Sequence, residues 1–280
     1  MAIKSPLVNV MERAARKAGR GLNRDFGEVE QLQVSPKGTG IFASTADTKA
    51  QAVLSEELNH ARPDFGMLME ESGATEGRDV EHRWIVHPLD GTVNFLHGIP
   101  HFSISIAVER STSFAGKPRT EIISSLVYDP IHDDSYWSDK AQGAYLNDRR
   151  LRVSARRRLG EALIGTGMAP KKSDRGADNH AEAIAPEAVL AGRVGGIRQL
   201  GSPALDLAYV AAGRYDGYWQ EGLAPWDVAA GILLVREAGG FAGEVDGRSD
   251  MITSGSIVAA NDHLHEELRD LLRTTKQGAT

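Results

Sequence analysis

Strand-like and helical segments alternate along the second half of this chain, and this alternation constrains the fold more than any other feature. Short apolar runs are typical of buried strands, whereas apolar residues at helical spacing predict amphipathic helices. The patterns predict strands over 162–165, 195–200, 215–220 and 257–260, and helices over 178–190, 203–212, 225–238 and 263–272. Strands that alternate with helices indicate an α/β region, which we assign to residues 148–280.

The first half has a different order, with helices before a run of strands. Ser5 and Pro6 form a helix-start signal, and helical spacing predicts a helix from there and another over 45–60. Strand-like segments follow at 66–69, 84–86, 102–108, 122–127 and 135–137. This order predicts an α+β region over residues 1–147, with an antiparallel or mixed sheet and helices on one face. The charged segment Asn147–Leu159 is the expected connection between the two halves of one catalytic unit.

Composition excludes several classes of protein. The 280 residues include no cysteine, which rules out disulfides, thiolate zinc sites, iron–sulfur clusters and a cysteine nucleophile. The 38 acidic against 32 basic residues give a formal charge of −6, whereas nucleic-acid-binding proteins are usually basic. The sequence contains no apolar stretch long enough for a membrane span and no signal-peptide pattern at its start. We therefore expect a cytoplasmic protein that does not contact a membrane.

Three acidic clusters lie at the ends of apolar strands or at the start of a helix. Glu70 follows a strand-like run, Asp90 and His87 follow another, and Asp227 begins an apolar helix. Each has an ordinary explanation by itself: a solvated loop, a tight Asp-Gly turn, and a helix-capping carboxylate. Together with the carbonyl of Leu89, the three carboxylates could bind Mg²⁺, which prefers oxygen ligands and often binds beside a substrate phosphate.

Four segments that cover most of the chain resemble the inositol monophosphatase family, especially its bacterial extragenic-suppressor branch. They read GMLMEESG (66–73), WIVHPLDGTVNFLHGIPHFSISIAV (84–108), GSPALDLAYVAAGRYDGYW (201–219) and PWDVAAGILLVREAGG (225–240). The resemblance implies a layered αβαβα sandwich of the sugar-phosphatase type and a homodimer. It also implies a lithium-sensitive phosphatase that uses two or three Mg²⁺ ions and an activated water to hydrolyse inositol 1-phosphate or a similar polyol phosphate.

The resemblance also assigns roles to individual residues. It places metal ligands at Glu70, Asp90, Asp227 and the carbonyl of Leu89, with His87 at one further ligand position. Asp47 and Thr92 would activate the attacking water, which Glu70 would help to orient. The amides of Gly91 and Thr92 would bind the phosphate. The other expected substrate contacts line the substrate or lie on the leaving-group side: Gly201, Ser202, Pro203 and Gln220, with Asp90 and Asp227 on the leaving-group side.

Three positions depart from the family pattern. His87 stands where the family has an aspartate that bridges two metal ions, and Gln220 stands where it usually has a glutamate. Ile41 replaces a residue that is often polar or acidic in bacterial relatives. Imidazole suits Zn²⁺ better than Mg²⁺ and cannot bridge two hard cations, so we expect weaker Mg²⁺ binding, lower activity and a possible role for Mn²⁺ or Zn²⁺.

Two alternative functions remain open at this point. The chain could be a catalytically impaired family member that acts through protein or RNA partners in transcription or RNA metabolism, with the Arg149–Arg158 segment as a contact surface. It could also be a phosphatase for another substrate, because the fold family also handles fructose 1,6-bisphosphate, adenosine bisphosphate and histidinol phosphate. The sequence does not decide among these substrates.

Overall fold

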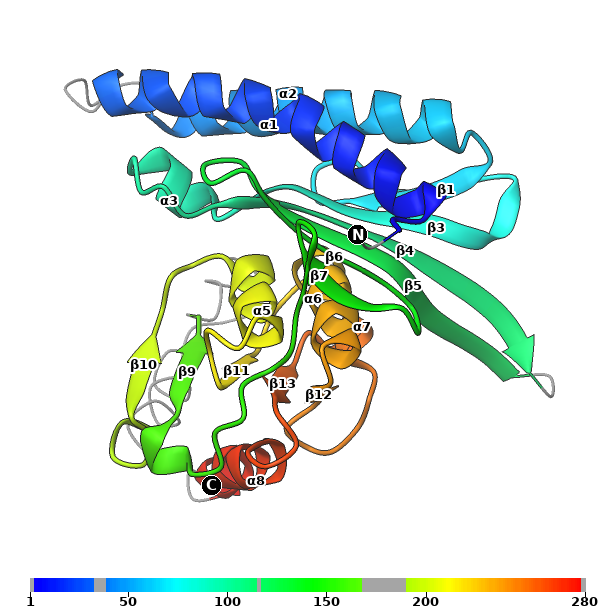
Figure 1. Ribbon diagram of the computed structural model, residues 1–280. Coiled ribbons are helices and arrows are strands. Elements are labelled where there is room, and N and C mark those ends of the chain that lie inside the picture. Colours follow the sequence, from blue (N-terminus) through cyan, green and yellow to red (C-terminus); the bar gives the residue numbers. More distant parts are fainter. Residues whose placement is uncertain (1–2, 33–38, 115–116, 168–189, 278–280) are drawn as a thin grey trace.

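The computed structural model describes residues 3–32, 39–114, 117–167 and 190–277, which form five layers of helices and sheets (Figure 1). The predicted helix over 178–190 lies, except for its last residue, outside the described residues, and so does the side chain of Ile41. The layers are α1 with α2, an eight-stranded sheet, α5 with α6, a five-stranded sheet, and α8. This is the mixed α/β sandwich that the sequence predicts.

Helices α1 (Pro6–Leu32) and α2 (Thr39–Ala61) form the first layer. The backbone N–H of Val8 donates to Ser5 Oγ at 3.2 Å, so Ser5 caps α1 as its residue type predicts. The buried face of α1 repeats at helical spacing and consists of Val8, Met11, Ala14, Ala15, Ala18, Leu22, Phe26 and Val29. This apolar face packs on the first sheet, and this packing explains why α1 continues as far as Leu32.

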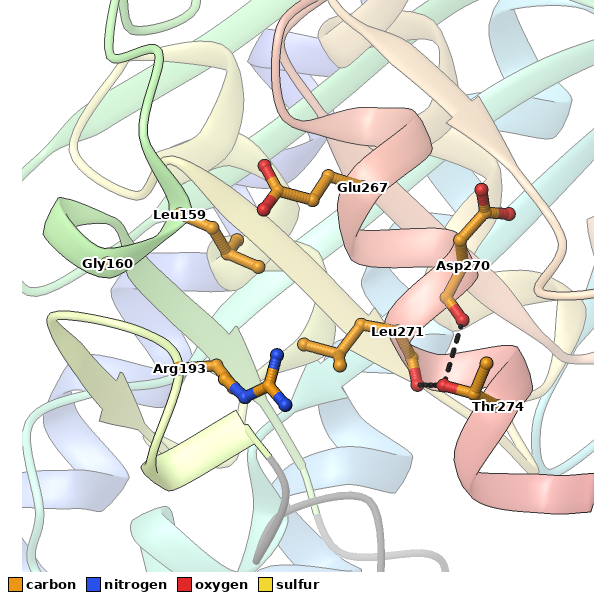
Figure 2. Close-up of a pocket in the computed structure, with 7 residues that line it drawn as sticks. All are labelled: Leu159, Gly160, Arg193, Glu267, Asp270, Leu271 and Thr274. Carbon is orange, nitrogen blue, oxygen red and sulfur yellow. Dashed lines mark hydrogen bonds between the residues drawn. The ribbon is translucent and has the colours of Figure 1, made fainter. Parts of the chain in front are cut away.

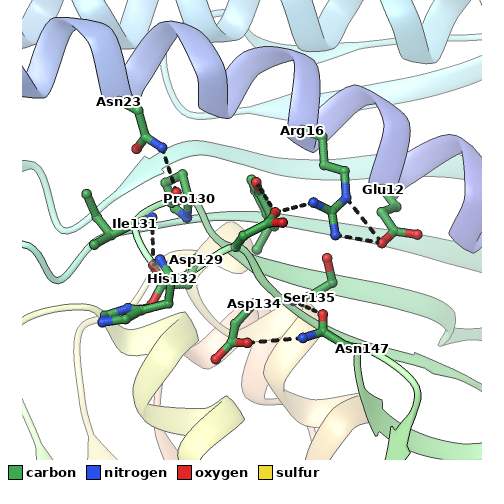
Figure 3. Close-up of polar contacts among 12 residues, drawn as sticks. Glu12, Arg16, Asn23, Asp129, Pro130, Ile131, His132, Asp134, Ser135 and Asn147 are labelled. Atoms are coloured by element: carbon green, nitrogen blue, oxygen red, sulfur yellow. Dashed lines mark hydrogen bonds and ion pairs between the residues drawn. The ribbon is translucent and has the colours of Figure 1, made fainter.

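Polar contacts also join α1 to the turn between β5 and β6 (Figure 3). Asn23 Nδ2 donates to the carbonyl of Pro130 at 2.6 Å. Arg16 donates to Glu12 one turn away, at 3.2 and 3.3 Å, and also to Asp133. These contacts hold the helix layer against one end of the first sheet.

The first sheet has the strand order β2-β1-β3-β4-β5-β6-β7-β8. Its strands are β1 (Phe65–Met69), β2 (Gly73–Thr75), β3 (Asp79–Asp90), β4 (Ser103–Phe114), β5 (Lys117–Asp129), β6 (Asp134–Asp139), β7 (Gly143–Leu146) and β8 (Arg149–Arg150). Among the described residues of this sheet, only β1 and β3 pair in parallel, so the sheet is mixed. A short helix, α3 (Thr92–Leu96), follows β3.

Helices cover both faces of this sheet, whereas the sequence predicted helices on one face. Trp84 and Val86 on β3 belong to the core beneath α1 and α2. Ile85, which points the other way, belongs to the core formed with α5 and α6. Successive side chains of a strand alternate between faces, so the apolar run at 84–86 is the signature of a strand that is buried on both sides.

The second sheet has the order β10-β9-β11-β13-β12. Its strands are β9 (Leu163–Thr166), β10 (Gly196–Arg198), β11 (Gly217–Gln220), β12 (Phe241–Gly243) and β13 (Ile257–Ala260). Its helical elements are η1 (Leu159–Glu161), α5 (Pro203–Ala211), α6 (Pro225–Glu237), α7 (Met251–Ser254) and α8 (His265–Gln277). Helices α5 and α6 lie between the two sheets, so they carry residues of the second half to the face of β3.

The chain passes from the first sheet to the second between β8 and β9. The backbone N–H of Val153 donates to the carbonyl of Ala238 at 3.1 Å, and Asn261 Nδ2 donates to the carbonyls of Ser154 and Arg156 at 3.0 and 2.9 Å. These contacts hold the connection against the second half. Within the described ranges, no helix combines the length and apolarity needed to cross a bilayer.

Candidate active site

The carboxyl end of β3 places His87 and Asp90 beside the α5–α6 layer. His87 is two residues after Ile85 and therefore points to the same face of the sheet. The pairing of β3 with β4 shifts between His87 and Asp90, and Pro88, which lies there, cannot donate a ladder hydrogen bond. Gly91 then turns the chain into α3 with φ of 94°, and a Cβ on it would lie 3.0 Å from the carbonyl oxygen of His101. Only glycine adopts this turn without strain.

Asp90 is almost fully buried and is held by groups from both halves of the chain. Its Oδ2 accepts hydrogen bonds from the Ser202 hydroxyl, from the backbone N–H of Ala204 at 3.0 Å and from Ser103 Oγ at 3.2 Å. Burial raises the pKa of Asp90 to about 6, although His87 and these donors oppose the shift. These three donors all meet Oδ2, whereas Oδ1 faces His87 Nδ1 at 3.8 Å.

Asp227 uses its two carboxyl oxygens for different purposes. Oδ2 accepts the backbone N–H of Ala224 at 2.8 Å, which caps the first turn of α6. Oδ1 lies 3.0 Å from His87 Nδ1. Asp227 therefore caps α6, as the sequence suggests, and also faces His87.

His87 lies at the centre of three carboxylates, and its side chain is only 9% exposed. Nε2 lies 3.0 Å from Glu70 Oε2, and Nδ1 lies 3.0 Å from Asp227 Oδ1 and 3.8 Å from Asp90 Oδ1. Burial alone would lower the pKa of His87, but the carboxylates of Asp227, Glu70 and Asp90 outweigh it and raise the pKa to about 10. Without a metal ion, the imidazolium therefore balances part of the negative charge.

Glu70 reaches His87 because β1 and β3 are parallel neighbours. Met69 pairs with Val86, so the residue that follows Met69 lies next to the residue that follows Val86. The Glu70 side chain is 41% exposed, so it lies partly in solvent while it contacts the buried ring of His87. Its position fits both the solvated loop and the site that the sequence suggested.

Asp47, on α2, is buried near Glu70 and His87. Burial and the negative charge of Glu70 raise its pKa to about 6, and its Oδ1 has no hydrogen-bond partner among the described residues. Thr92 Oγ1 donates to the carbonyl of Leu89 at 3.1 Å. The hydroxyl proton of Thr92 is thus used inside its own turn, and Asp47 is not its acceptor in this arrangement.

The loop before α5 is tied to α3 by Asn94. Asn94 Nδ2 donates to the carbonyls of His101 and Leu200 at 2.7 and 2.6 Å. A Cβ on Gly201, whose φ is 78°, would lie 3.4 Å from this same Nδ2. Gly201 and Ser202 therefore lie against the β3–α3 turn, and Pro203 begins α5 directly after them.

Gln220 lies at the end of β11, in contact with different groups from those around His87. Its Oε1 accepts a hydrogen bond from the Tyr218 hydroxyl. Gly167 packs so closely against the amide that a Cβ there would meet Gln220 Oε1 at 2.2 Å. Gln220 is buried, so a charged glutamate would be costly in the same position.

Sequence reasoning missed three groups that position the acidic residues: Ser103, Asn94 and the backbone N–H of Ala204. Ser103 pairs with Asp90 across β3 and β4, so the strand register brings them together. Asn94 and Ala204 act through contacts more than 100 residues apart in the chain. No local pattern reports such contacts.

One nitrogen and two carboxyl oxygens are close enough to bind one metal ion. His87, Asp90 and Asp227 each offer a ligand atom, and these atoms lie within 4.8 Å of one another. A separate hollow, shown in Figure 2, lies between η1 and α8 on the outer side of the second sheet. It is lined by Arg193, Glu267 and Asp270 among others, and it lies away from the residues that the sequence motifs predict.

Comparison with known proteins concerns the whole chain. The model of the inositol monophosphatase family matches residues 3–277. The chain is 50% identical to an inositol-1-monophosphatase of Mesorhizobium japonicum, over 98% of this chain and 97% of that protein. It is 39% identical to the Nus factor SuhB of Escherichia coli K12, over 96% and 99%.

The structure of the extragenic suppressor protein SuhB from Bartonella henselae is similar throughout. It superposes with a TM-score of 0.83 at 45% identity, covering 96% of this chain and all of that one. The match spans both halves of the chain, and the acidic residues lie where the motifs predict strand ends and a helix start. The chain therefore belongs to the inositol monophosphatase family.

Proposed function

We propose that this protein is a divalent-metal-dependent phosphomonoesterase that hydrolyses inositol 1-phosphate or a similar polyol phosphate. The observation that carries the proposal is the convergence of His87, Asp90 and Asp227 from two halves of the chain, with ligand atoms within 4.8 Å. The family match and the 50% identity to a protein named inositol-1-monophosphatase support the reaction class and the substrate class.

The residues at this point fit a metal ion in number and type. Asp90 Oδ1, Asp227 Oδ1 and His87 Nδ1 would hold it, and the carbonyl of Leu89 and Glu70 are the further ligands that the resemblance suggests. A divalent ion bound there would polarise the phosphoryl oxygens, lower the pKa of a bound water and stabilise the leaving oxygen. Two or three Mg²⁺ ions are the family expectation, but position 87 offers no carboxylate to bridge a pair of them.

The chain's own groups supply the other requirements of the reaction. Asp47 has a pKa of about 6 and a free Oδ1, so it can take a proton from water near neutral pH. The amides of Gly91 and Thr92, at the start of α3, would bind the phosphate. Gly201, Ser202 and Pro203 would line the substrate, and the amide of Gln220 would hydrogen-bond to one of its hydroxyl groups.

The test is phosphate release from myo-inositol 1-phosphate across concentrations of Mg²⁺, Mn²⁺ and Zn²⁺, followed by a panel of other phosphomonoesters. We expect turnover with at least one ion, and its loss in Asp227→Asn. Glu71→Gln is the matched control, because Glu71 is exposed and neighbours Glu70. The absence of turnover with all three ions and every substrate would exclude a phosphatase.

A second candidate is a catalytically impaired family member that acts through an RNA or protein partner in transcription. The favouring observations are the 39% identity to a relative named Nus factor SuhB and the imidazole at position 87. Arg149 on β8, and Arg152 and Arg157 on the connection that follows it, are exposed, and Asn261 and Ala238 hold this connection in place. Two results together would support this candidate. The protein should show no phosphatase turnover, and it should bind RNA in a salt-sensitive manner that charge reversal at these arginines abolishes.

We also propose that the protein is a homodimer. Val93, Ile99 and Leu200 are exposed apolar side chains around Asn94, which bonds to the backbone of Ile99 and Leu200. Apolar side chains gathered beside a site often belong to an interface. Light scattering on the full chain should give twice the monomer mass, and Ile99→Lys should shift the mass toward the monomer.

A further inference from the structure

The two ring nitrogens of His87 have different surroundings. Nε2 lies 3.0 Å from Glu70 Oε2, on the more exposed side of the site. Nδ1 is buried and makes no hydrogen bond of normal geometry with any described residue, although carboxyl oxygens of Asp227 and Asp90 face it at 3.0 and 3.8 Å. The ring is thus held at one nitrogen, and the other points into the acidic cluster.

The two carboxylates that face Nδ1 are both held through Oδ2 by donors of the described residues. Asp90 Oδ2 accepts hydrogen bonds from Ser202, Ser103 and Ala204, and Asp227 Oδ2 accepts the N–H of Ala224. Each of these aspartates therefore directs Oδ1 toward His87. Ligands of one zinc-like ion have bonds of about 2.0–2.2 Å. Nδ1 lies 3.0 and 3.8 Å from the two carboxyl oxygens, and all three ligand atoms lie within 4.8 Å of one another, so small side-chain movements bring them around a single ion.

We propose that His87 Nδ1, Asp90 Oδ1 and Asp227 Oδ1 form a site for one borderline transition-metal ion of the Zn²⁺ or Co²⁺ class, and that Glu70 positions His87 instead of binding this ion. A histidine that binds a metal usually donates its other N–H to a carboxylate, which sets the tautomer and the ring orientation. Glu70 has the place and the distance for that role. Imidazole nitrogen selects Zn²⁺-like ions over Mg²⁺.

This inference rests on the proposed function for its chemical purpose, because it names the ion with which the same site would hydrolyse phosphate. It changes the role of Glu70, which the resemblance assigns as a metal ligand. Metal binding is measured without substrate, so its failure is separate from a failure of catalysis. Zn²⁺ binding without turnover would support the metal site and contradict the phosphatase. Turnover with Mg²⁺ in a protein that does not bind Zn²⁺ would support the phosphatase and contradict the metal site.

The experiment is calorimetric titration of the full chain, stripped of metal with a chelator, with Zn²⁺, Co²⁺ and Mg²⁺ in turn. We expect one Zn²⁺ or Co²⁺ per chain, bound more tightly than Mg²⁺. Glu70→Ala should weaken Zn²⁺ binding about 10–100-fold. Glu70→Gln should restore most of the affinity, because an amide oxygen still accepts the N–H of Nε2. Glu71→Gln is the control for the lost charge and should bind like the unchanged protein.

A second measurement does not depend on any variant. In protein with ¹⁵N-labelled histidine, Zn²⁺ should shift the resonance of His87 Nδ1 and leave Nε2 protonated. A shift at Nε2 instead, or no change at His87, would overturn the assignment. Equal loss of affinity in Glu70→Gln and Glu70→Ala would show that Glu70 is a ligand, and tighter binding of Mg²⁺ than of Zn²⁺ would show that the site retains the family's preference for hard ions.

Discussion

The imidazole of His87 determines the charge and the ligand set of the candidate site. A carboxylate at this position would add a fourth negative charge beside Glu70, Asp90 and Asp227, and further cations would be needed to balance it. A single imidazolium instead lies 3.0 Å from a carboxyl oxygen of Glu70 and 3.0 Å from one of Asp227. One substitution therefore changes both the number and the kind of metal ions that the surrounding residues can hold.

The first prediction is that His87→Asp restores a bridge for two hard cations. Half-maximal phosphate release from inositol 1-phosphate should then require less Mg²⁺, because carboxylate oxygen suits Mg²⁺ and imidazole does not. The measurement is initial rate against Mg²⁺ concentration for both proteins. An unchanged or higher Mg²⁺ requirement would mean that the surrounding residues have adapted to the histidine.

The second prediction concerns Asp206, which lies on α5 behind Asp90. It is 1% exposed, and neither carboxyl oxygen has a hydrogen bond of normal geometry among the described residues. Burial, and then the charge of Asp90, raise the pKa of Asp206 well above 3.8. The folded state therefore binds this proton more tightly than the unfolded state, so stability is lost as the pH rises from 3.8 through the folded pKa.

Asp206→Asn should remove this loss, because the amide cannot ionise. In alkaline buffer the free energy of unfolding should therefore rise by about 1–3 kcal/mol, since the unchanged protein must bury a charged carboxylate there. The measurement is urea unfolding of metal-free protein at acidic and alkaline pH. A destabilised variant at alkaline pH would show that the carboxylate is paired in solution.

At the scale of elements, the close contact of α5 with α6 places Asp227 against β3. Gly231 lies in α6, and a Cβ there would meet Leu207 of α5 at 2.4–2.5 Å. The missing side chain lets the two helices approach. Both helices also pack on the first sheet, so their separation determines where the start of α6 meets His87.

We therefore predict that Gly231→Ala destabilises the protein by about 1–3 kcal/mol through overpacking, which exceeds the gain of about 1 kcal/mol in helix propensity. Gly21→Ala in α1 is the matched control, because no described atom lies within 4 Å of its added Cβ. The control should stabilise the protein by about 0.4–1 kcal/mol. Thermal and urea unfolding compare the two, and equal effects would refute the close-packing argument.

At the scale of the whole molecule, the candidate site joins layers that are otherwise connected through α5 and α6. His87 and Asp90 come from the first sheet, whereas Asp227 comes from the helix layer between the sheets. Asp90 also accepts hydrogen bonds from Ser202 and Ala204 of the second half. A ligand that bridges these residues binds only the folded chain and stabilises both halves together.

The corresponding prediction is that Zn²⁺ at a free concentration about 100-fold above its dissociation constant adds about 2.7 kcal/mol to the free energy of unfolding. Thermal unfolding with and without the ion measures the gain. His87→Ala should show a much smaller gain under the same conditions. An equal gain in that variant would place the stabilising ion elsewhere.

Local sequence was enough to predict the main helices and the central parts of the strands, because periodicity and capping are local properties. It predicted Ser5 as the cap of α1 and the apolar helix that begins with Asp227. It did not predict β2, β7, β8 or β12, or the full lengths of β3, β4 and β5. Strands gain length from hydrogen bonds to neighbouring strands, and those partners lie elsewhere in the chain.

The sequence by itself determined the family, the layered α/β class and the acidic residues at strand ends and a helix start. Only the tertiary structure decided how they meet: Glu70 at Nε2 of His87, Asp227 and Asp90 at Nδ1, and Thr92 with Leu89 instead of Asp47. The physical reason is that these contacts depend on the parallel register of β1 and β3 and on how closely α6 approaches the sheet. Both depend on packing between residues far apart in the chain, which residue spacing does not record.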